Sequence, residues 1–174
     1  LFTISPEVAL IAMGVIILMI SGEFDLSVGS VFALSGVVLV ILTNSGFNPW
    51  IAMAISLITC IFIGYVNSFI TLRFGIPSFI ATLGTMFMVR SLAIVIVKAE
   101  FPTFPLEAME LPRAILANPI PGTFFRMSFV WFVLIFLLLV FYLHKSNYGN
   151  WSYSTGANRS AAAAMGVNTN NVKI

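Results

Sequence analysis

A run of 21 residues, Trp50 to Ile70, contains no charged side chain. A helix needs about 20 mostly apolar residues to cross the hydrocarbon core of a bilayer. Pro49 precedes the run and suits the first turn of a helix, because its missing N–H would be unpaired there in any case. The run is therefore predicted to be a full-length transmembrane helix, and the rest of the chain must fold in or beside a membrane.

Four other apolar segments accompany this run. They cover about residues 8–20, 26–42, 78–97 and 124–143. Hydrophobic residues make up 60% of the chain and charged residues only 8%, whereas soluble domains are roughly 25% charged. We therefore expect an all-α fold, a polytopic transmembrane helix bundle that forms a single transmembrane domain over residues 1–174. Because the sequence begins with Leu1 and stops just after a motif, we expect a fragment of a longer chain.

The basic residues indicate the orientation of the bundle. A 29-residue loop, 98–126, contains five prolines and separates the last two apolar segments. If successive segments cross the membrane in alternate directions, four basic residues lie on one side: Arg73, Lys145, Arg159 and Lys173. Three lie on the side of the loop: Lys98, Arg113 and Arg126. Because cytoplasmic loops are enriched in Lys and Arg, this count favours an external loop 98–126 and a cytoplasmic segment 145–174.

The C-terminal part of the chain is rich in alanine. Asn158 is a good N-cap, four alanines follow it closely, and Gly166 can end a helix. Such a helix is too short to cross a bilayer and lacks the large apolar face needed to lie on one. We predict a short helix over about residues 158–167. It suits docking into a partner, and the alternative is an ordinary connector between spans.

A polar break between the first two apolar segments contains Glu23 and Asp25. A carboxylate at mid-bilayer costs about 2.5–3.5 kcal/mol on insertion scales. Asp25 therefore either lines a polar path, together with Ser27, or caps a helix that begins at Leu26 and lies at the interface.

Uncharged polar groups occur within the third and fourth apolar segments. Asn67 offers an amide, and Thr82 and Thr85 offer hydroxyls. Such groups suit an uncharged polyol, which needs hydrogen-bond partners but no opposite charge. The alternative is that they bond to neighbouring backbone and hold helices together.

The spans differ in side-chain size. In the third, small residues recur every fourth position: Ala52, Ser56, Cys60, Gly64 and Ser68. Such a stripe allows another helix to approach closely, so we expect Ser56, Gly64 and Ser68 to face other helices. The fifth is built of large apolar residues, so we expect Phe132, Phe136 and Leu139 to face lipid.

The sequence patterns typical of several functional classes are absent from the chain. The chain has no Ser/His/Asp arrangement, no paired-carboxylate spacing and no phosphate-binding loop, so an enzyme is not indicated. A single cysteine, Cys60, supports neither a disulfide nor a metal site. The net charge of +2 with scattered basic residues does not indicate nucleic-acid binding. We expect no metal and no cofactor bound by this chain.

Three separated strings, in order, carry a family resemblance: Glu23–Ser30, Gly75–Thr85 and Gly156–Lys173. They resemble the permease subunits of bacterial ABC importers for monosaccharides, the ribose/xylose type. Departures from the family pattern are Glu23 in place of Gly and Phe24 in place of Ile. Asn150 and Ala163 stand where the family often has Arg.

The resemblance implies a multi-pass protein of the bacterial inner membrane that moves a small neutral sugar or related polyol. ATP hydrolysis is expected on a separate ATP-binding cassette subunit, and further implied partners are a periplasmic sugar-binding protein and a second permease subunit, as a homodimer. The candidate path residues are Asp25, Ser27, Asn67, Thr82 and Thr85, and the candidate ATPase-coupling residues are Gly156, Asn158, Ala161, Ala162 and Gly166. The alternative function is a secondary transporter, with coupling-ion ligands near a broken helix.

Overall fold

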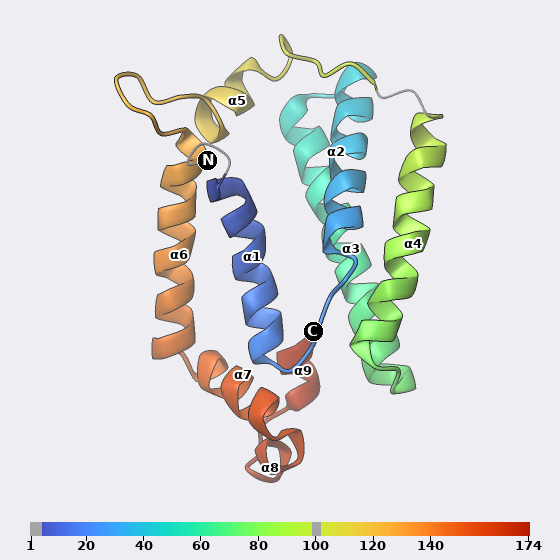
Figure 1. Cartoon of the computed structure of the whole chain (residues 1–174), viewed down its shortest axis with the longest axis vertical. Coiled ribbons are helices and arrows are strands. Elements are labelled where there is room, and N and C mark those ends of the chain that lie inside the picture. The colour runs from blue at the N-terminus through green and yellow to red at the C-terminus, as the bar shows by residue number, and fades with distance from the viewer. Residues whose placement is uncertain (1–4, 99–101) are drawn as a thin grey trace. The chain divides into compact units, whose positions relative to one another are not determined.

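The computed structural model describes residues 5–98 and 102–174, which form helices joined by connecting segments (Figure 1). Within these residues the helices are α1 (Ser5–Ile20), α2 (Val28–Asn44), α3 (Pro49–Phe74), α4 (Ser78–Val97), α5 (Glu110–Leu116), α6 (Met127–Lys145), α7 (Asn147–Ala157), α8 (Arg159–Ala164) and α9 (Thr169–Lys173). Pro119 and Arg126 make an isolated antiparallel bridge before α6. The predicted all-α fold is confirmed.

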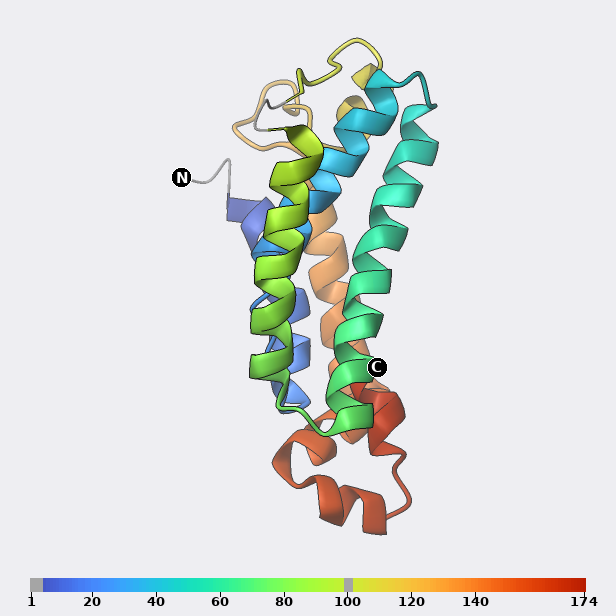
Figure 2. The same ribbon diagram turned by 90° about the vertical axis from the view of Figure 1, so that its right-hand side faces the viewer.

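The chain divides into two compact units. Asp25–Pro112 forms one, which we name the three-helix unit, and Leu1–Phe24 with Arg113–Ile174 forms the other, which we name the two-segment unit. In the three-helix unit, α2, α3 and α4 all contact one another, and successive helices run in opposite directions (Figure 2). Its core is a cluster of Leu34 from α2 with Val89 and Ala93 from α4. Leu34 is 2% exposed.

Local signals set both ends of α3. The side chain of Asn48 accepts a hydrogen bond from the Trp50 N–H at 2.9 Å, and Pro49 occupies the first turn. Gly75 ends the helix in the left-handed region with φ 68°, a conformation that L side chains other than Asn and Asp seldom adopt. The helix is 26 residues long, five more than predicted, because these signals and not the loss of hydrophobicity decide where it stops.

The small-residue stripe on α3 is buried only in its first half. Ala52 is fully buried, and the Ser56 hydroxyl donates to the Ser35 carbonyl of α2 at 2.6 Å. Small side chains thus let α2 and α3 approach closely, as expected. Gly64 is exposed, with open space where a Cβ would lie. The prediction that Gly64 faces another helix is therefore wrong for this chain, and Ser68 is only half-buried.

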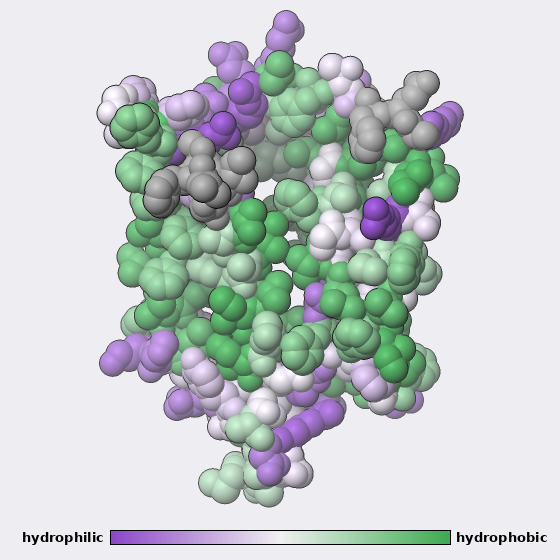
Figure 3. Space-filling model, in the orientation of Figure 1, coloured by the Kyte–Doolittle hydropathy of each residue, from purple (hydrophilic) through white to green (hydrophobic). Residues whose placement is uncertain are grey.

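In the two-segment unit, α1 packs along α6 and the two helices run in the same direction (Figure 1). Directly after α6 the chain forms α7, α8 and α9, which contact one another, and α7 also contacts α1. Hydrophobic side chains cover the visible face of α1 and α6, whereas hydrophilic and neutral ones gather over α7–α9 (Figure 3). The sequence predicted one short helix in this segment, and the structure has three.

Among the described residues, three helices are long and apolar enough to cross a membrane: α3, α4 and α6. The apolar helices at Pro6–Ile20 and Val28–Asn44 are shorter. All five predicted apolar segments therefore form helices. Their number and composition agree with a multi-pass membrane protein.

Candidate functional site

The break before α2 is folded by the carboxylate of Asp25. One of its oxygens, Oδ1, accepts hydrogen bonds from both the backbone N–H and the hydroxyl of Ser27, each at 2.6 Å. Helix α2 begins at Val28, with Ser27 at the N-cap. Of the two alternatives for Asp25, the cap of a helix beginning at Leu26 is therefore wrong in position, because Asp25 closes a turn just ahead of the helix.

A chain of hydrogen bonds runs from this turn across α3 to α4. The amide nitrogen of Asn67, in α3, donates to the Ser27 hydroxyl at 3.1 Å. The amide oxygen of the same side chain accepts from the Thr85 hydroxyl of α4 at 2.6 Å. Asp25, Ser27, Asn67 and Thr85 thus form one connected set, which we name the polar network.

Thr82 makes a separate connection between the same elements. Its hydroxyl accepts a hydrogen bond from the Leu26 N–H at 3.1 Å and donates one to the Ser78 carbonyl at 2.7 Å. The segment before α2 is therefore fastened to α4 through its backbone. Sequence reasoning singled out Thr82 for its side chain, but a backbone donor such as Leu26 leaves no signal in the sequence.

The structure brings all five predicted path residues together within the three-helix unit. Ser27, Asn67 and Thr82 are 0%, 5% and 3% exposed, and Asp25 and Thr85 are half-buried. A buried amide or hydroxyl is costly unless it is hydrogen-bonded, and here each makes such a bond. The bonds are those expected of groups that hold helices together, while their contact with a solute stays a prediction.

The alanine-rich segment folds as its sequence indicates. The Asn158 side chain accepts from the Ala161 N–H at 3.0 Å and so caps α8. Gly166, with φ 88°, lies in the left-handed region beyond the helix end. Arg159 donates to Asn170 Oδ1 at 2.6 Å and to the Thr169 hydroxyl at 3.4 Å, which ties α8 to α9.

The five candidate coupling residues occupy different environments. Ala161 and Gly166 are exposed, and beside them Met165 is 85% exposed. Ala162 is 4% exposed, so a bulky substitution there would disturb the segment's own packing. Met165 was not predicted to be part of the coupling surface, although a large apolar residue at the end of an alanine run indicates a contact site.

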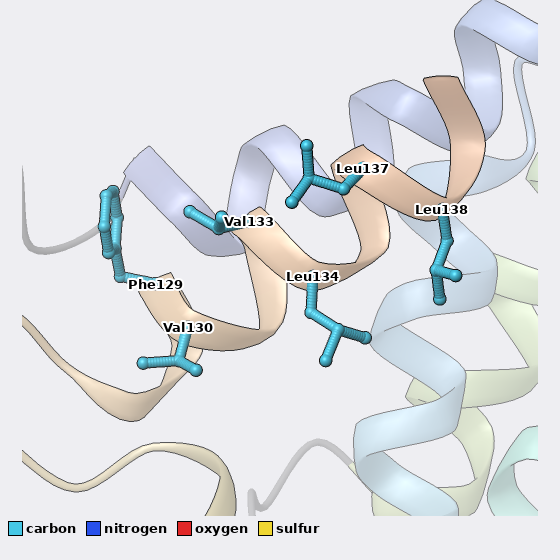
Figure 4. Close-up of a pocket in the computed structure, with 6 residues that line it drawn as sticks. All are labelled: Phe129, Val130, Val133, Leu134, Leu137 and Leu138. Atoms are coloured by element: carbon cyan, nitrogen blue, oxygen red, sulfur yellow. The ribbon is translucent and has the colours of Figure 1, made fainter. Parts of the chain in front are cut away.

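An apolar groove lies along α6 and is lined by six side chains: Phe129, Val130, Val133, Leu134, Leu137 and Leu138 (Figure 4). Because all six are apolar, the groove suits hydrocarbon contact and offers a polar solute no hydrogen bond. Phe136 is exposed as predicted, whereas Phe132 and Leu139 are half-buried. Within the described part of the chain, no group of three or more His, Cys, Asp or Glu side chains could hold a metal ion.

The whole chain matches a known protein family. A family model described as "Branched-chain amino acid transport system / permease component" covers residues 1–174. The chain is 27% identical to an autoinducer 2 import system permease protein, LsrC, of Photorhabdus luminescens, over 99% of this chain and 51% of that protein. It is 30% identical to the inner membrane ABC transporter permease protein YjfF of Escherichia coli (strain K12), over 100% of this chain and 53% of that protein.

The LsrC protein of Salmonella typhimurium is similar at 29% identity, over 99% of this chain and 48% of its own length. The chain thus spans about half the length of the curated relatives it matches. No solved structure matches it. The relatives are named as transport permeases, and they confirm the resemblance to bacterial ABC-importer permeases that the sequence indicated.

Proposed function

We propose that this chain forms membrane-spanning helices of an importer permease. It belongs to the family described as branched-chain amino acid transport system / permease component. The importer is driven by ATP and moves a small neutral sugar or related polyol across the bacterial inner membrane. Two relatives are named for autoinducer 2 import and one as an inner membrane ABC transporter permease. These names support assignment to the importer class and a location in the inner membrane.

The observation that carries the substrate class is the polar network. Among apolar helices it provides an amide and hydroxyls from Asn67, Ser27 and Thr85, and the single carboxylate in it, Asp25, is bonded to Ser27. Uncharged donors and acceptors match the hydroxyls of a neutral solute. The members of the network bond one another in this conformation, so a solute that bonds to them would replace hydrogen bonds within the network.

ATP hydrolysis belongs, in this proposal, to a separate ATPase subunit that α8 contacts from the cytoplasm. The exposed Ala161, Met165 and Gly166 offer a slim surface around one large apolar side chain. Small side chains lose little conformational entropy on docking. An external solute-binding protein and a second permease copy complete the proposed importer. In this proposal the chain itself binds no cofactor.

The test uses the full-length permease in proteoliposomes with its ATPase and binding protein. A panel of labelled neutral solutes, among them pentoses, hexoses, inositol and a furanosyl compound, is offered with and without ATP. The proposal expects uptake of at least one of them that requires ATP and survives a protonophore. Uptake that follows the proton gradient and needs no ATP would instead indicate a secondary transporter.

A further inference from the structure

We propose that Glu23 and Gly156 are positioning residues that fasten the segment α7–α9 to the end of α1, so that the segment and α1 move as one body. The use of this attachment in ATP-driven transport depends on the proposed function, because it assumes that the segment docks to an ATPase. Two contacts within the two-segment unit support the attachment itself.

The first contact joins backbone to backbone. A Cβ added at Gly156, in the last turn of α7, would overlap the carbonyl oxygen of Ile20 and lie 3.0 Å from its carbonyl carbon. A Cβ added at Gly22 would lie 3.4 Å from the Cα of Gly156. Since both atoms meeting Gly156 belong to main chain, no rotamer change could make room for a side chain. The close approach therefore requires glycine at position 156.

The second contact is an ion pair between residues 150 positions apart. The ammonium of Lys173, in α9, lies 2.5 Å from Oε1 of Glu23, which follows α1. Their side chains are 8% and 16% exposed. Water screens such a pair less than it screens one on an open surface. Removal of one charge abolishes this attraction between α9 and the end of α1 and is therefore expected to weaken the attachment.

Two attachments at different helices restrict the segment more than either would alone. The contact at Gly156 and the packing of α7 on α1 and α6 hold one end of the segment, and the ion pair holds its other end, at α9. Arg159 ties α8 to α9 through Asn170 and Thr169. The exposed surface of α8 is thus held in a fixed orientation with respect to the end of α1.

Spin-label mobility tests the attachment directly. Asn171 lies in α9 with an exposed side chain, and Asn171→Cys would carry a nitroxide in the full-length permease, with Cys60 and any other cysteine replaced by alanine. The variants are Glu23→Gln, Lys173→Gln, Gly156→Ala and the exchanged pair Glu23→Lys with Lys173→Glu. Matched controls are Glu7→Gln, an exposed carboxylate in the first turn of α1, and Gly14→Ala, where a Cβ would meet open space.

We expect loss of the immobile spectral component in both Gln variants and in Gly156→Ala, its return in the exchanged pair, and no change in either control. An unchanged spectrum in Glu23→Gln and Gly156→Ala would overturn the proposal, as would equal changes in the controls. Co-purification of the ATPase with the unmodified permease is measured separately. Its failure would count against the proposed function while leaving the attachment standing, so the two outcomes are distinguishable.

Discussion

The hydrogen bond between Asn67 and Thr85 gives a sharp test of how the three-helix unit is stabilised. Thr85→Val removes the hydroxyl and keeps the shape of the side chain nearly constant. The bond joins α4 to α3 at 2.6 Å, so the variant leaves the Asn67 amide oxygen without this donor. Hydrogen bonds between membrane helices contribute on average about 0.6 kcal/mol and at most about 1.7 kcal/mol. Because this one is short and its acceptor is buried, we expect a loss of about 1 kcal/mol.

A double-mutant cycle isolates the bond from the general effects of each substitution. Asn67→Ala also breaks the bond to Ser27 and removes side-chain volume, so we expect it to cost more, about 2 kcal/mol. The coupling between Asn67→Ala and Thr85→Val should be about 1 kcal/mol. Thr59→Val is the matched control, because the Thr59 hydroxyl bonds only its own helix, at Ile55 O, among the hydrogen bonds of the described chain.

The assay is reversible unfolding of the full-length permease in mixed detergent micelles, with uptake measured on the same preparations. A coupling energy near zero, or a Thr59→Val variant as unstable as Thr85→Val, would refute this account of the bond. Uptake adds a second comparison. If Thr85→Val transports normally per folded molecule, the bond serves stability alone, whereas a loss of uptake beyond the loss of folded protein supports a place in the solute path.

Three other outcomes are expected. Gly75→Ala should cost about 1–2 kcal/mol of unfolding free energy, because φ at Gly75 is 68° and left-handed backbone is strained with a Cβ, while Gly84→Ala, with open space around it, should not destabilise; equal effects in thermal unfolding would contradict this. Asn158→Ala should lower the stability of α8 by about 1 kcal/mol through loss of its N-cap and Asn158→Asp should not, which amide hydrogen exchange of the following residues reports. Ala161→Trp, on the exposed surface, should reduce ATPase co-purification with normal permease yield, whereas Ala162→Trp, at a buried site, should reduce the yield itself; the reverse pattern would place the docking surface elsewhere.

The sequence predicted elements whose signals are local. Long apolar runs gave the spanning helices, and Asn158 with Gly166 delimited α8, because capping depends on a few neighbouring residues. It missed α7, whose mixture of Tyr, Trp, Ser and Gly residues has no clear apolar period, and α9, which is five residues long. Helices this short are stabilised mainly by packing, which the sequence does not display.

The candidate site shows the same division. Asn67, Thr82 and Thr85 could be chosen because uncharged polar side chains within apolar segments are uncommon and visible in a sequence. Their mutual bonds depend on the angles at which α2, α3 and α4 pack. The turn closed by Asp25 is local, because its carboxylate bonds Ser27, two positions ahead. The pairing of Glu23 with Lys173 spans 150 positions, and no local pattern connects the two.

The length of α3 gives bilayer thickness a direct effect on the three-helix unit. At 1.5 Å per residue, 26 residues extend about 39 Å, against a hydrocarbon core of about 30 Å. An upright α3 therefore carries its last turn, with the exposed Arg73, among the lipid headgroups. Its uncharged run of 21 residues, about 32 Å long, matches the hydrocarbon core, so a thinner bilayer creates a mismatch and favours tilting. Only three residues, 75–77, connect α3 to α4, so a tilt of α3 also moves the first turn of α4. Thr82 of α4 accepts a hydrogen bond from the Leu26 N–H and so links this movement to the segment before α2. Lipid composition, which sets the bilayer thickness, therefore affects the geometry of the polar network through the tilt of α3.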